Sequence, residues 1–98
     1  MTMVRIGAVL LLTMLPAPLA RAQTFVSYSC ADGTSISGAF FKGERNMRIQ
    51  MDGRALTLPQ RLAASGARYA KAGVSFWIKG QDATLKRPKR KTTTCRAL

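Results

Sequence analysis

The feature that most constrains this chain is a pair of cysteines, Cys30 and Cys95, which are the only two in its 98 residues. A domain of this size obtains only a few kcal/mol from its core, so a covalent staple is expected. Free thiols and a zinc site are the alternatives, but two sulfurs do not complete a zinc shell and the chain has no histidine. The pair therefore predicts one disulfide, worth roughly 4 kcal/mol through its restriction of the unfolded chain.

The N-terminal segment predicts export. Arg5 precedes an apolar run over residues 6–15, and the segment ends in Ala-Arg-Ala at positions 20–22, a small-x-small cleavage pattern. A membrane anchor is the weaker alternative, because spanning a bilayer takes about 20 apolar residues. We expect residues 1–22 to be a secretory signal peptide and residues 23–98 to form one periplasmic domain. No cysteine lies at the cleavage site, so we expect a soluble protein with neither a lipid anchor nor a transmembrane span after cleavage.

Turn signals divide the expected domain into short segments. They are Asp32-Gly33, Lys42-Gly43, Asp52-Gly53, Ala72-Gly73 and Lys79-Gly80. Between them apolar and polar residues alternate, and no stretch keeps a helical period. This pattern predicts an all-β domain of antiparallel hairpins. The expected strands lie near residues 25–30, 35–42, 45–51, 54–59, 67–71, 74–79, 83–87 and 92–96.

Two segments carry a family resemblance. Residues 65–69 read Ser-Gly-Ala-Arg-Tyr, and Lys79 follows ten residues later inside the segment 77–85. Together with Tyr-Ser-Cys at 28–30 and Leu-Pro-Gln at 58–60, their order resembles that of bacterial inhibitors of c-type lysozyme. The resemblance implies a small antiparallel β-barrel of about eight short strands. It also implies a function, in which a Ser-Gly-x-x-Tyr loop and a lysine enter the catalytic cleft of c-type lysozyme and so protect peptidoglycan.

The resemblance implies a role for each residue of the expected lysozyme-binding site. Ser65 would bring a hydroxyl to a catalytic carboxylate, and Lys79 would pair with the enzyme's acidic residues. Gly66 and Tyr69 would shape and support the loop, and Arg68 is a candidate additional contact. Each has an ordinary alternative: a plain turn at Ser65 and Gly66, an exposed turn lysine at Lys79, a core aromatic at Tyr69 and a solvated charge at Arg68.

The expected strand at 74–79 supports the role of Lys79 without reference to any family. Strict alternation puts Lys79 on the face of Ser75 and Trp77, away from the core, where its ammonium is free to reach a partner. A c-type lysozyme cleft holds two carboxylates, so an occupant should bring hydrogen-bond donors and positive charge. We interpret Trp77 and Tyr28 as packing residues and leave them out of the site.

Charge raises a question about the partner. Of 16 basic residues, Arg5 and Arg21 fall in the predicted signal peptide, which leaves 14 against 4 acidic residues. C-type lysozymes are usually basic as well, so long-range forces would slow the encounter most at low salt. Screening acts over about 8 Å at physiological ionic strength, so local attraction at an acidic cleft can still dominate after contact.

The run from Lys86 to Lys91 contains five basic residues and one proline. It is either a solvated hairpin end that discourages strand addition or an attachment to anionic lipopolysaccharide or wall polymers. The second interpretation gives the alternative function, a cationic envelope-binding module without an enzyme target. An exported protein is not expected to bind nucleic acid.

An enzyme is the least supported class of function. The chain has no histidine, its four acidic residues mostly occupy turns, and no phosphate loop or nucleophile elbow occurs in the sequence. A Ser65–Lys79 dyad is the remaining formal candidate for a nucleophile. We therefore predict a protein without catalytic residues, metal or cofactor.

Overall fold

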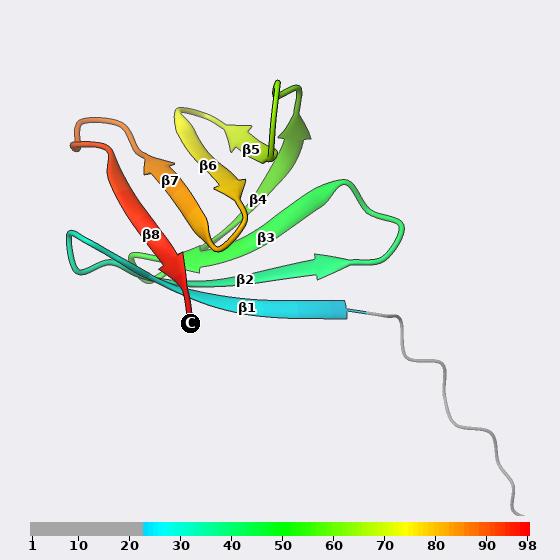
Figure 1. Ribbon diagram of the computed structural model, residues 1–98, viewed down its shortest axis with the longest axis horizontal. Helices are drawn as coiled ribbons and strands as arrows, with labels where there is room; N and C mark the ends of the chain where they lie inside the picture. The colour runs from blue at the N-terminus through cyan, green and yellow to red at the C-terminus, as the bar shows by residue number, and fades with distance from the viewer. Residues whose placement is uncertain (1–22) are drawn as a thin grey trace, which may run out of the picture.

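The computed structural model describes residues 23–98, so the predicted signal peptide lies outside the described residues. Eight antiparallel strands form a closed barrel in which each strand pairs with the next and β8 returns to β1 (Figure 1). The strands are β1 (Gln23–Cys30), β2 (Ser35–Phe41), β3 (Asn46–Met51), β4 (Arg54–Arg61), β5 (Ala67–Lys71), β6 (Val74–Lys79), β7 (Asp82–Lys86) and β8 (Thr93–Ala97). The predicted all-β fold is confirmed, and each expected strand overlaps an observed one. Within the described residues no helix is long and apolar enough to cross a membrane.

The glycine signals form tight hairpins for a geometric reason. At Asp52 and Gly53 both φ angles are positive, 53° and 72°, and Ala72 and Gly73 repeat this with 52° and 83°. Two-residue turns of this kind match the right-handed twist of the strands that they join. The turn between β6 and β7 begins at Gly80, whose φ is also positive at 63°.

The core follows the predicted alternation along each strand. Phe76 and Met47 are fully buried, and Ile49, Leu58 and Leu85 are at most 1% exposed. Tyr28 meets Phe76 edge to face, with 4.9 Å between the ring centroids. The fold is therefore held by one apolar core inside the barrel.

The predicted disulfide is confirmed. Cys30 and Cys95 are bonded, and they lie directly opposite one another where β8 pairs with β1. These two strands come from opposite ends of the described chain, so the disulfide fastens the strand pair that closes the barrel.

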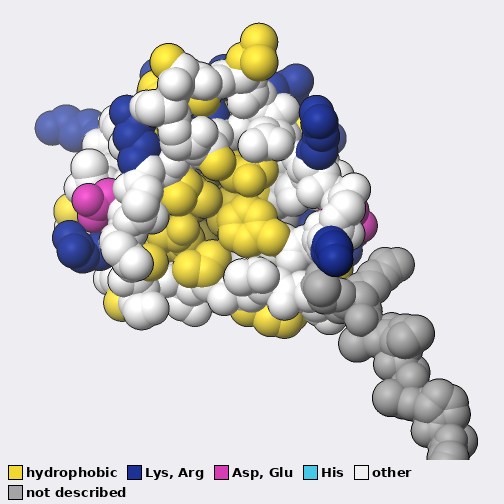
Figure 2. Space-filling model, turned by 45° about the vertical axis from the view of Figure 1, so that its right-hand side comes forward, with side chains coloured by type: hydrophobic (Ala, Val, Ile, Leu, Met, Phe, Trp, Pro, Cys, Tyr) yellow, Lys and Arg dark blue, Asp and Glu magenta, His cyan; other side chains and the backbone are white. Residues whose placement is uncertain are grey.

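Antiparallel order assigns the connections to two ends of the barrel. The end that we call the Arg87 end carries the β1–β2, β3–β4, β5–β6 and β7–β8 connections. The opposite end, called the Ser65 end, carries the β2–β3, β4–β5 and β6–β7 connections together with the start of β1. Figure 2 shows a face beside the start of β1, where hydrophobic side chains gather in a hollow with lysine and arginine around it.

The structure corrects the interpretation of the basic run as a wholly solvated hairpin end. Arg87 is only 7% exposed. Its guanidinium donates to Asp32 Oδ2 at 2.7 Å and to Asp52 Oδ2 at 2.8 Å, and Arg90 lies 3.4 Å from the same Asp52 oxygen. Arg87 thus ties the β1–β2 and β3–β4 connections to the β7–β8 loop, whereas the rest of the run, Lys86 and residues 88–91, is exposed.

Candidate functional site

The loop between β4 and β5 rests on the end of β6, and Gly66 makes that approach possible. Its φ is 71°, in the region that favours glycine. A Cβ at this position would overlap the backbone carbonyl oxygen of Ile78 and lie 2.9 Å from Lys79 Cγ. A larger residue would therefore push the loop away from Lys79.

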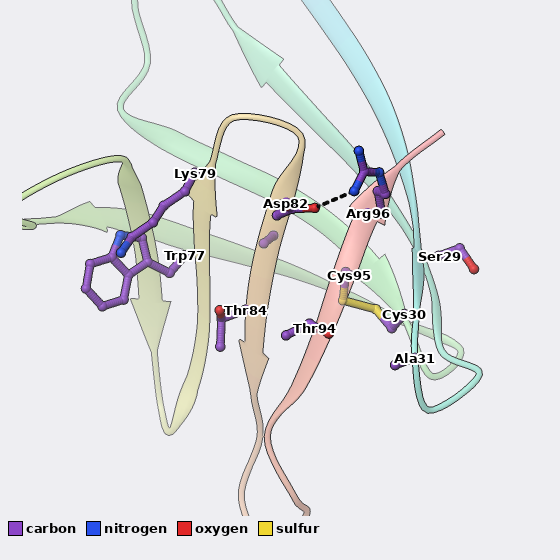
Figure 3. A pocket seen from close by; sticks show the side chains of 11 residues that line it. Ser29, Cys30, Ala31, Trp77, Lys79, Asp82, Thr84, Thr94, Cys95 and Arg96 are labelled. Carbon is purple, nitrogen blue, oxygen red and sulfur yellow. Dashed lines mark hydrogen bonds and ion pairs between the residues drawn. A yellow bond between two sulfur atoms is a disulfide. The ribbon is translucent and has the colours of Figure 1, made fainter.

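Trp77 joins the two parts of the expected site. Its indole Nε1 donates a hydrogen bond to the backbone oxygen of Ser65 at 2.8 Å. The Lys79 ammonium lies over the same indole ring, 4.3 Å from its centroid, and Figure 3 shows the lysine side chain folded back over the ring. A cation over an aromatic face is an attractive arrangement. Trp77 therefore packs against both the Ser65 loop and the Lys79 side chain, and its interpretation as a packing residue omitted these two contacts.

Both expected contact residues are accessible. Ser65 and Lys79 are exposed, and Lys79 lies on the outer face of β6 with Trp77, as alternation predicts. Within residues 23–98 Lys79 makes no ion pair, because Asp82, its partner in the β6–β7 register, pairs instead with Arg96 at 3.3 Å. The ammonium therefore keeps its charge available to an outside carboxylate.

Tyr69 lies in a different environment from Ser65 and Lys79. It is 8% exposed, inside the barrel, and its ring is 5.7 Å from that of Phe40. Burial raises the pKa of the Tyr69 hydroxyl above its ordinary value of 10.0. Arg68 is half-buried on the outer face of β5, opposite Trp77. The structure thus brings Ser65, Gly66 and Lys79 together, with Arg68 nearby and Tyr69 beneath the surface.

A shallow groove of about 730 Å³ continues outward from Lys79. It crosses the outer faces of β6, β7 and β8 toward the disulfide, and Figure 3 shows the side chains that line it. The groove widens the surface that a partner at Lys79 would cover. Leu62, in the same loop as Ser65, is 95% exposed and adds an apolar group that no sequence pattern singled out.

Comparisons with known proteins identify the family of this chain. The model of the family described as membrane-bound lysozyme-inhibitor of c-type lysozyme matches residues 28–94. The chain belongs to this family. A membrane-bound lysozyme inhibitor of C-type lysozyme from Yersinia enterocolitica is 36% identical over 81 residues, which cover 83% of this chain and 68% of the relative. One from Cupriavidus necator is 33% identical over 63 residues, covering 62% of this chain and 50% of the relative.

A solved structure is similar over the whole barrel. It is Pseudomonas aeruginosa MliC in complex with hen egg white lysozyme, with a TM-score of 0.64 and 24% identity, covering 94% of this chain and 99% of that one. At this identity the likeness supports the fold.

Proposed function

We propose that this protein inhibits c-type lysozyme by placing the Ser65 loop and the Lys79 side chain in the catalytic cleft. The observation that carries the proposal is their arrangement. Gly66 packs against Lys79, and the Trp77 indole contacts both the Ser65 backbone and the Lys79 ammonium. Family membership supports the same function, because the relatives are named as inhibitors of this enzyme class. In this proposal the protein acts by occlusion and is not an enzyme.

The chemistry of the cleft fits what the site offers. A c-type lysozyme uses two carboxylates in different environments. The Ser65 hydroxyl can donate to one carboxylate, and the Lys79 ammonium can donate three hydrogen bonds and neutralise charge. Because Trp77 holds the loop and the lysine before binding, less side-chain freedom is lost on binding.

Lys79→Ala tests the proposal. We expect the free energy of binding to lysozyme to weaken by about 2–5 kcal/mol, because a lysozyme carboxylate would be buried without its partner. Ser65→Ala should cost less, on the order of 1.5–3 kcal/mol for a hydrogen bond to a charged group. The measurement is inhibition of bacterial lysis by c-type lysozyme, with thermal melting to check the fold. Lys42→Ala is the matched control, because Lys42 is also an exposed lysine at the Ser65 end. Equal inhibition by the Lys79 and Lys42 variants would rule out the cleft contact.

We also propose that the protein works as a soluble periplasmic domain, since residues 20–22 read as a signal-peptidase site and the first cysteine is Cys30. The disulfide agrees with an oxidising compartment. Mass spectrometry of the exported protein should find Gln23 at its N-terminus with no acyl group. An acylated or uncleaved chain would contradict this location.

A further inference from the structure

The shortest register between neighbouring strands of the barrel is that of β4 and β5. Their register consists of two pairs, Gln60↔Tyr69 and Arg61↔Arg68, whereas β3 and β4 pair from Asn46 to Met51. The next pair would place Pro59 opposite Ala70, and a proline has no N–H to continue the ladder. Arg61 Nε donates instead to the Ala70 carbonyl oxygen at 3.0 Å. The first half of β4 lies beyond the end of β5 in this register and is not paired with it.

A groove of about 640 Å³ lies at this seam. Its walls come from the first half of β4, from the β5–β6 turn and from the β7–β8 loop, so it opens at the Arg87 end. Leu56, Val74 and Pro88 are among its apolar lining residues. Pockets of this size commonly hold small ligands, with an apolar lining and a few polar groups that fix orientation.

Cations surround the groove. Arg54, Lys71 and Arg90 line it, and its one acidic lining residue, Asp52, is already paired with Arg87 and Arg90. Arg54 and Lys71 are exposed and make no ion pair within residues 23–98. The rim therefore offers uncompensated positive charge above apolar side chains, which is the complement of an anionic headgroup attached to an acyl chain.

We infer that this groove is a second binding site, which takes the anionic headgroup of a membrane lipid together with the adjoining part of its acyl chain. Neither the lysozyme-binding residues nor the family comparisons assign a role to it. Three exposed lysines, Lys86 at the end of β7 and Lys89 and Lys91 in the β7–β8 loop, lie at the same end and add attraction to an anionic bilayer surface.

The position of the groove gives this site a consequence for orientation. The Arg87 and Ser65 ends are separated by the length of a strand, roughly 15–20 Å at about 3.3 Å per residue. A soluble barrel that docks reversibly on a membrane through its Arg87 end would direct Ser65 and Lys79 away from the membrane, toward an incoming enzyme. Lipid binding and lysozyme binding can therefore occur together.

Vesicle binding tests the inference independently of lysozyme inhibition. The exported protein is incubated at physiological salt with vesicles of phosphatidylglycerol and phosphatidylcholine, or of phosphatidylcholine alone, and the bound fraction is measured by sedimentation. We expect binding to the anionic vesicles only, and we expect Arg54→Gln with Lys71→Gln to weaken it by roughly 10- to 30-fold. The control is Lys42→Gln with Arg45→Gln, which removes the same charge at the Ser65 end.

The control pair should change vesicle binding by less than about threefold, because those charges lie farther from the membrane than the screening length of about 8 Å. The groove pair should inhibit lysozyme as the parent does, so loss of inhibition and loss of lipid binding are separable. Equal losses in the two pairs would mean that net charge alone attracts the protein, and the groove would not be a site. Binding to phosphatidylcholine alone, no binding to either vesicle, or full competition by free glycerol phosphate would also overturn the inference.

Discussion

At the scale of single residues, the candidate site depends on two residues that hold others in place. Gly66 allows the loop to touch β6, and Trp77 binds Ser65 through its N–H and Lys79 through its ring. Sequence motifs identified Ser65, Gly66 and Lys79 but not Trp77. An aromatic residue in a strand is usually a packing residue, and its hydrogen bond reaches a residue 12 positions away, which no local pattern reveals. The sequence did offer one indication of this role, because strand alternation places Trp77 on the same face as Lys79.

Gly66→Ala tests whether contact between the loop and β6 matters for inhibition. We expect much weaker inhibition, by about 2 kcal/mol or more, because the new Cβ would collide with the Ile78 carbonyl and displace the loop. The measurement is the inhibition constant against c-type lysozyme.

Gly43→Ala is the matched control for this change. Gly43 also has a positive φ, 87°, but a Cβ there meets nothing within 4 Å. Backbone strain should cost each variant about 1 kcal/mol of folding stability. The collision adds to this cost only in Gly66→Ala, and only Gly66→Ala should lose inhibition. If the two variants inhibited equally well, close packing of the loop would not be required.

At the scale of secondary structure elements, the sequence predicted the strands and turns well. It predicted the long-range contacts between their connections less well. Alternation and the Asp52-Gly53 and Ala72-Gly73 turns act locally, so they could be read from the chain itself. The burial of Arg87 could not, because it depends on Asp32 and Asp52, which are 55 and 35 positions away. In the sequence, Arg87 is indistinguishable from its basic neighbours.

Arg87→Ala should therefore destabilise the fold although neighbouring substitutions do not. We expect a loss of roughly 1–3 kcal/mol in the free energy of unfolding, because Asp32 and Asp52 would lose charged hydrogen bonds while staying partly exposed to water. Lys91→Ala is the control, since this exposed residue of the same loop should change stability by less than about 0.5 kcal/mol. Urea unfolding measures both, and equal stabilities would refute the structural role of Arg87.

Asp32 adds a pH dependence with a defined sign. Hydrogen bonds from the Thr34 hydroxyl and backbone N–H, and then the Arg87 charge, lower the pKa of Asp32 below its ordinary 3.8. Because its pKa is lower in the folded state, the contribution of Asp32 to stability is present above pH 3.8 and is lost as pH falls through the folded value. Titration of the carboxyl by NMR should show this lowered pKa in the parent. Arg87→Ala should raise it only partly, since the Thr34 bonds remain.

At the scale of the whole molecule, the barrel is a scaffold whose two ends carry different functional groups. The Ser65 end presents a loop and a free ammonium, and the Arg87 end gathers ion pairs around one buried guanidinium. The family resemblance predicted the barrel and the loop, because both are encoded in short ordered motifs. The groove between β4 and β5 was not predicted, because it results from a short ladder between strands whose own patterns look regular.

Reduction of the disulfide should threaten the whole barrel at once. Cys30 and Cys95 fasten the β1–β8 pair, whose register covers three residue pairs, and the bond closes a loop with a sequence separation of 65. In the chain-entropy model this is worth roughly 4 kcal/mol, out of about 5–15 for a typical domain. About 1 kcal/mol of stability shifts Tm by roughly 4–8 °C for a domain of this size, so reduction should lower Tm by about 15–30 °C.

Circular dichroism melting with and without reductant measures the shift in Tm. Alkylation of the unreduced protein is the control, because it should leave Tm unchanged. A reduced protein that melted within a few degrees of the oxidised one would show that pairing of β1 and β8 closes the barrel without help from the covalent bond.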